Sequence, residues 1–105
     1  MPASWRRLEA RYPGVVSAYD ALRQACDEAG RLDAGTVALV KLAVSVGAGA
    51  PRTVHAHSKK ALRRGVAPSD LRQVALAALP TIGLPRMLDA LAWIDESIAE
   101  HEQAP

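Results

Sequence analysis

Two histidines separated by one residue, His55 and His57, are the side chains best suited to proton transfer in this sequence. Their neighbours favour a helix over about 51–64, on which residues two apart point to different sides. His57 then shares a face with Val54 and Ala61, which directs it toward the core or a cleft between subunits. His57 is therefore a candidate acid/base group, with a hydrogen-bonded structural histidine as the alternative.

Because His55 and His57 point to different sides of the helix, they are not expected to bind one metal ion together. Residues 51–61 contain no carboxylate, so neither histidine has an acidic ligand within one helical turn. His101 stands among Glu100 and Glu102 and is expected to be solvated. We expect neither a bound metal nor a cofactor.

Cys26 is the single cysteine, which excludes an intramolecular disulfide and a zinc site with several thiolates from one chain. Val15, Tyr19 and Leu22 recur with it at helical spacing, so the pattern predicts a helix over 14–29. The thiol is expected to be buried on the apolar face of that helix. A chain with one cysteine suits a reducing compartment, and we expect a cytoplasmic protein.

Length and charge narrow the class of protein. Half of the 105 residues are hydrophobic, which predicts one globular domain over residues 1–105. The formal charge of +2 is too small to indicate a nucleic-acid partner, and the basic residues of 59–64 have no interleaved aromatic side chains. No apolar run is long enough for a membrane span, because Pro80, Gly83 and Pro85 interrupt the longest uncharged stretch.

The elements that must position these residues are helices. Phe is absent and no window alternates polar with apolar residues, so we predict an all-α fold of about six helices. The fifth helix is opened by Pro68 and Asp70 and is expected to be interrupted at Pro80. The other five are expected near 3–12, 14–29, 34–48, 51–64 and 84–101.

Three of these helices, over 34–48, about 70–79 and 84–98, have broad apolar faces. Asp33 can cap the helix over 34–48, whose apolar residues cover nearly its whole circumference, so it is predicted to be central and buried. In the last helix the residues expected to point inward are Leu84, Met87, Leu88, Leu91, Ile94 and Ile98. A chain of this length cannot readily cover so much apolar surface alone, which predicts a homo-oligomer.

The run Leu39–Gly47, followed by His55–Arg72, resembles the carboxymuconolactone decarboxylase and alkyl hydroperoxidase D superfamily. The resemblance covers about residues 32–95. It rests on the order of the pieces: a buried helix, a helix bearing a histidine, a basic turn with a glycine, and a further capped helix. It implies an all-helical fold whose subunits assemble as trimers or hexamers.

In the hydroperoxidase branch, the resemblance implies a glutamate, a Cys-x-x-Cys pair and a histidine that form a proton relay and a redox couple. Aligned through His57, the two cysteine positions hold Ala50 and Thr53, and the glutamate position holds Ala38. Neither a methyl group nor a hydroxyl can replace the thiolate that attacks a peroxide. Thiol peroxidase activity is therefore expected to be absent.

The decarboxylase branch also lacks the cysteine pair. Its reaction needs a cation to hold the substrate carboxylate and an acid/base group to protonate the carbanion. For such a reaction His57 is the candidate catalytic acid/base group and Arg52 or Lys41 the candidate cation, with Thr53 as a further candidate substrate-binding residue.

Two functions follow from these expectations. The first is a redox-inactive binding or scaffold protein that takes a small-molecule ligand. The alternative is a small-molecule lyase or isomerase that uses His57 in a pocket between subunits.

Overall fold

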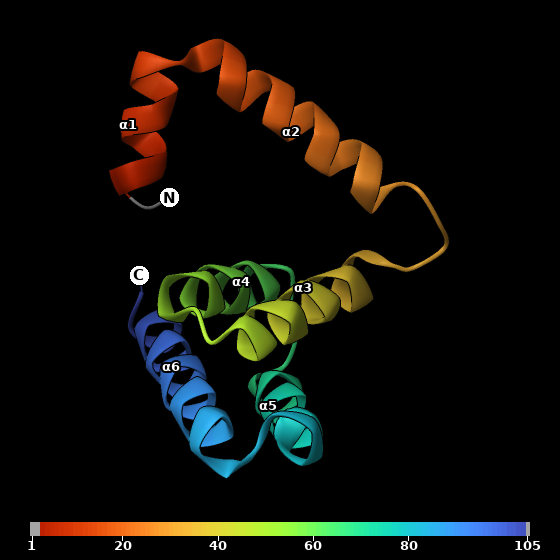
Figure 1. Ribbon diagram of the computed structural model, residues 1–105, viewed down its shortest axis with the longest axis vertical. Helices are drawn as coiled ribbons and strands as arrows, with labels where there is room; N and C mark the ends of the chain where they lie inside the picture. The colour runs from red at the N-terminus through yellow and green to blue at the C-terminus, as the bar shows by residue number, and fades with distance from the viewer. Residues whose placement is uncertain (1–2, 105) are drawn as a thin grey trace. The chain divides into compact units, whose positions relative to one another are not determined.

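The computed structural model describes residues 3–104, which form six α-helices and no strand. The predicted all-α fold of about six helices is confirmed. The chain divides into two compact units, of which the first ends at Leu32 and the second begins at Asp33. Figure 1 labels the helices of both units.

The first unit contains α1 (Ala3–Arg11) and α2 (Pro13–Asp27). Pro13 opens α2, where its fixed φ suits the first helical position and its missing N–H costs no intrahelical bond. The rings of Trp5 and Tyr19 join the two helices edge to face, with centroids 5.6 Å apart.

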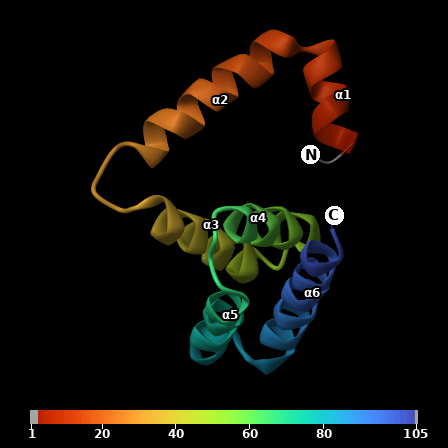
Figure 2. The ribbon, with the colours of Figure 1, turned by 180° about the vertical axis from the view of Figure 1, so that it is seen from behind.

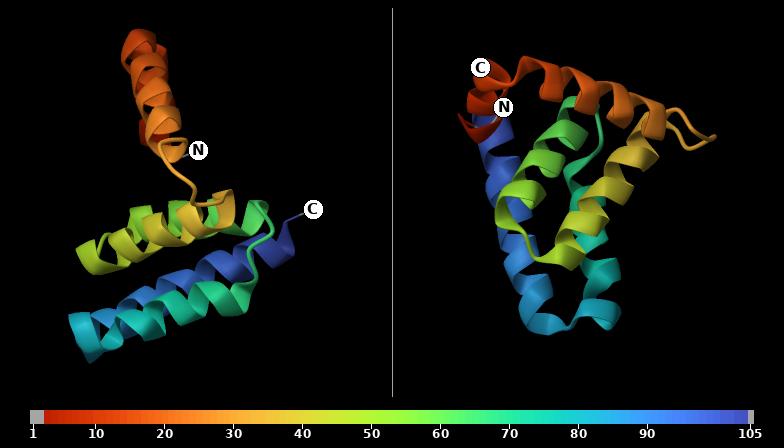
Figure 3. Two further views of the ribbon diagram at one scale, coloured as in Figure 1. Left: turned by 90° about the vertical axis from the view of Figure 1, so that its right-hand side faces the viewer. Right: turned by 45° about the horizontal axis from the view of Figure 1, so that its top comes forward.

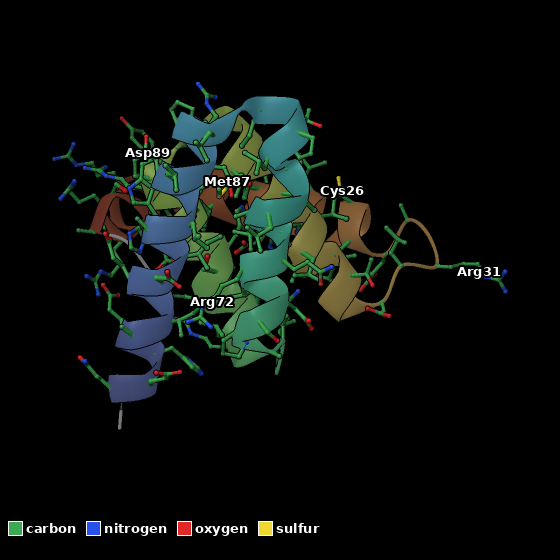
Figure 4. The ribbon with its side chains drawn as sticks, turned by 90° about the horizontal axis from the view of Figure 1, so that it is seen from below. Cys26, Arg31, Arg72, Met87 and Asp89 are labelled. Atoms are coloured by element: carbon green, nitrogen blue, oxygen red, sulfur yellow. The ribbon has the colours of Figure 1, made fainter. Side chains whose placement is uncertain are left out.

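The prediction that the Cys26 thiol is buried is wrong, because Cys26 is exposed on α2 (Figure 4). Val15, Tyr19 and Leu22, which share its stripe, are each more than half exposed. Within the unit, α2 has only α1 as a neighbour, and a helix of nine residues covers little of a helix of fifteen. The apolar spacing identified the helix correctly, but it could not show what covers the stripe.

The second unit contains α3 (Ala34–Ala48), α4 (Pro51–Arg63), α5 (Pro68–Ile82) and α6 (Leu84–Gln103). They form two layers, α3 with α4 and α5 with α6, as the left view of Figure 3 shows. Helices α4 and α5 each pack against both α3 and α6. Helices α5 and α6 lie side by side and are joined by a short turn at Gly83 (Figure 2).

Helix α3 has the ends that its sequence predicts. The Asp33 carboxylate accepts a hydrogen bond of 2.8 Å from the Thr36 amide at the start of the helix. Gly49 ends it in the left-handed conformation, at a φ of 66°. The Arg86 guanidinium donates to the Gly47 carbonyl at 2.7 Å, so a cation satisfies one of the last carbonyls.

The core of the second unit lies between the two layers. Its buried apolar residues are Ala38, Leu42, Val46, Val54, Ala61, Leu62, Leu71, Ala75, Met87, Ala90, Ile94 and Ile98. Figure 4 shows Met87 toward α5, whereas Asp89 points away from that helix.

The prediction that α3 is buried around its whole circumference is wrong. Leu42 is 0% exposed, but Val40 is 47% and Val44 69% exposed. The reason is that α4 and α5 cover one side of α3, and the second unit has no further helix for the other side. Leu84 and Leu88 of α6, also predicted to point inward, are more than half exposed for lack of a neighbouring helix on their side.

Pro80 does not interrupt α5, which continues to Ile82. Proline removes one amide donor, so the Leu76 carbonyl lacks its usual i−4 bond, but only two residues of α5 follow Pro80 and little helix remains to be disrupted. The Gly83 amide donates to the Leu79 carbonyl at 2.9 Å and closes the helix. Across the described part of the chain, every helix is too short or too polar to cross a bilayer.

Candidate functional site

His57 lies in the middle of α4 and is half-buried. Val54 and Ala61, one turn before and after it, are fully buried, so the imidazole stands at the edge of the core. Within residues 3–104 the ring has no hydrogen-bond partner. A half-buried imidazole with both nitrogens unbonded retains its capacity to bind a ligand or move a proton.

The surroundings of His57 disfavour its charged form. Burial lowers the pKa of His57 below its ordinary value, and the positive charges of Lys60 and Lys41 lower it further. The imidazole is therefore neutral at neutral pH. A neutral ring beside two ammonium groups can accept a proton or hydrogen-bond to an anion that the ammonium groups attract.

The four residues selected from the sequence come from two neighbouring helices. Lys41 of α3 is close enough to act on His57 of α4. Arg52 and Thr53 occupy the first turn of α4 and are exposed. Thr53 is one turn before His57 and thus on the same side of the helix, whereas no ion pair links Arg52 to another residue of the described chain.

The positions that correspond to the hydroperoxidase relay carry no redox group. Ala38 is buried in α3, and Ala50 is half-buried immediately before α4. Cys26, the single thiol of the chain, belongs to α2 in the other unit. The α3–α6 unit therefore has no thiol of its own.

His55 was not selected from the sequence as a site residue, yet it has more side-chain partners than His57. Its Nδ1 lies 2.8 Å from the Ser97 hydroxyl, and its Nε2 lies 3.1 Å from the Glu96 carboxylate. One signal was available: His55 and Lys59 are four residues apart, as are Glu96 and Glu100. When two helices pack together, basic residues four apart on one helix can pair with acidic residues four apart on the other.

The described part of the chain holds no group of three or more His, Cys, Asp or Glu side chains arranged to bind a metal ion. Around His57 the charged neighbours that act on the ring are ammonium groups, which repel a cation. The arrangement at His57 is suited to an anionic partner.

Comparison with known proteins adds one finding. A family model described as the carboxymuconolactone decarboxylase family matches residues 13–96. The match begins in the first unit, continues through the second, and includes both Lys41 and His57. The comparisons with curated proteins and with solved structures gave no match.

Proposed function

The chain belongs to the carboxymuconolactone decarboxylase family, and from this membership we propose that it is an oligomeric binding protein without thiol peroxidase activity. Its ligand in this proposal is a small organic anion held beside His57. A reducing cytoplasmic location, suited to a chain with one cysteine, is part of the same proposal. The proposal also includes a single domain over residues 1–105. The family match supports it, because the matched residues 13–96 belong to both units.

The proposal of an anionic ligand rests on one observation. The half-buried imidazole of His57 has no hydrogen-bond partner in residues 3–104, and the positive charge of Lys41 acts on it. The ammonium group attracts a carboxylate, and the neutral ring supplies a directional hydrogen bond to it. Thr53, one turn earlier on the same side of α4, offers a hydroxyl to the same ligand.

Binding of carboxymuconolactone, the compound in the family's name, tests this ligand class. The probe is expected to shift the NMR signals of the His57 ring, because its carboxylate is held beside that ring. Lys41→Gln is expected to weaken binding about tenfold, since a hydrogen bond to a charged group is lost.

Lys59→Gln is the matched control, because Lys59 is on α4 but pairs with Glu100. It should leave the affinity for the probe unchanged. Equal losses in the two variants, or no shift of the His57 signals at saturation, would contradict an anion site at His57.

The lowered pKa of His57 favours a second candidate, a lyase or isomerase in which the neutral ring acts as the acid/base group. The two functions differ in the fate of the probe. A binding protein leaves it intact, whereas a lyase consumes it with release of carbon dioxide, and His57→Gln abolishes that turnover.

Absence of thiol peroxidase activity is expected in a direct assay. Peroxide reduction needs a thiolate nucleophile and a second thiol to resolve the sulfenic acid, and the chain has one cysteine. The purified protein is mixed with an organic hydroperoxide and a dithiol reductant, and turnover is followed. The rate should equal that of Cys26→Ser, and a higher rate in the unmodified protein would overturn this part of the proposal.

The proposed oligomer, a trimer or hexamer by analogy with the family, is supported by apolar side chains that the single chain leaves exposed. The largest of these in the second unit are Val40, Val44, Leu76, Leu84 and Leu88. Association between copies would remove them from water.

A further inference from the structure

Two polar contacts in register join α4 to α6. His55 of α4 faces Glu96 of α6 at 3.1 Å, and one turn later Lys59 of α4 pairs with Glu100 of α6. The two contacts differ in chemistry, because lysine stays charged over the physiological pH range whereas histidine changes its charge within it.

The Nδ1 atom of His55 lies beside the Ser97 hydroxyl, which can either donate a hydrogen bond to Nδ1 or accept one from it. Ser97 is fully buried, and its oxygen lies 2.8 Å from His55 Nδ1 and 3.0 Å from the Trp93 carbonyl oxygen. A hydroxyl has one proton to donate and can also accept. Ser97 can therefore donate to Nδ1, or donate to the Trp93 carbonyl while it accepts from Nδ1.

We propose that His55, Glu96 and Ser97 form a proton-dependent clasp that holds α4 more strongly to α6 when the His55 ring is charged. With a neutral ring, Nε2–H donates to Glu96 and Nδ1 accepts from Ser97. When the ring takes up a proton at Nδ1, Ser97 turns its own proton to the Trp93 carbonyl. No hydrogen bond is lost, and the contact with Glu96 becomes an ion pair.

Charged groups of both helices lie near His55. Helix α6 presents two carboxylates, Glu96 and Glu100, while on α4 the nearby Lys59 is already paired with Glu100. Lys59 lowers the pKa of Glu100, and the charge of His55 contributes a smaller effect in the same direction. Lys41, the one ionisable residue of α3, acts on His57.

The two histidines of α4 thus respond to acid in opposite ways. The pKa of His57 is lowered in the folded chain, so its contribution to stability is present above the unfolded pKa and lost as pH falls through the folded value. Protonation of His55 strengthens the clasp instead. The pH dependence of the whole protein contains both effects, and a measurement specific to the His55–Glu96 pair must separate them.

A double-mutant cycle of His55→Asn and Glu96→Gln isolates the pair, because effects of every other group cancel. Urea unfolding of the full chain is measured at pH about 5.5 and about 8, on either side of the titration of a histidine. At the lower pH the pair is expected to change the unfolding equilibrium constant roughly threefold to fivefold, as befits a partly exposed ion pair. At the higher pH this coupling should fall to within about 1.5-fold of unity, as for a weak neutral contact.

The matched control is a cycle of Lys59→Met and Glu100→Gln, one turn along the same two helices. Its coupling should be the same at both values of pH. Equal His55–Glu96 coupling at the two values, or none at the lower one, would overturn the clasp. If His55→Asn does not fold, Glu96→Gln alone decides, since Glu96 is 58% exposed: it must destabilise the protein more at the lower pH than at the higher one.

Discussion

Leu42→Ala is expected to lower the free energy of unfolding of the α3–α6 unit by about 3 kcal/mol, with about 2–5 kcal/mol as the usual range for such a change. Leu42 is 0% exposed and lies on the inner face of α3 with Ala38 and Val46, one turn to either side. The core around it contains several alanines, which cannot extend into the space that the lost side chain leaves. A loss of this size is a large fraction of the stability of a small domain.

Chemical denaturation measures this loss, and Leu32→Ala provides a control. Leu32 is 60% exposed and lies before the start of α3, outside the faces proposed to associate, so the same truncation should cost under about 1 kcal/mol. Equal effects of the two substitutions would show that the core does not lie between the two helical layers.

Val44→Glu is expected to convert the proposed oligomer into monomers without unfolding the chain. Val44 is 69% exposed on the side of α3 that its own unit does not cover, and Val40 lies one turn before it on the same side. If copies of the chain pack over this face, the substitution buries an unpaired carboxylate in the interface, which costs several kcal/mol per subunit contact. In the monomer the same carboxylate is solvated.

Light scattering coupled to gel filtration reads out the mass, and circular dichroism confirms that helical content is retained. Gln73→Glu adds the same charge at an exposed position of α5 that has no apolar character, and this control should keep the mass of the unmodified protein. An unmodified protein that is already monomeric at micromolar concentration would contradict the proposed oligomer. An oligomer that survives Val44→Glu would place the interface elsewhere.

The predicted and observed helices agree most closely where the signals are local. Helix α3 is found at Ala34–Ala48 as predicted, because Asp33 caps its start and Gly49 and Pro51 follow its end. Candidate site residues on these helices could be named for the same reason: helical spacing alone puts Thr53 and His57 on one side of α4. Capping, turn conformation and spacing involve residues a few positions apart, so the sequence by itself determines them.

Burial and pairing were decided by tertiary structure. The stripe of Cys26 and the outer face of α3 have the apolar pattern of a core, yet both are exposed because no helix of their own unit covers them. His55 obtains its partners from α6, about forty residues later in the chain, and no local pattern specifies which helix will lie opposite. Helical spacing shows which residues share a face, but contacts between distant segments determine what that face meets, and these depend on how all the helices pack together.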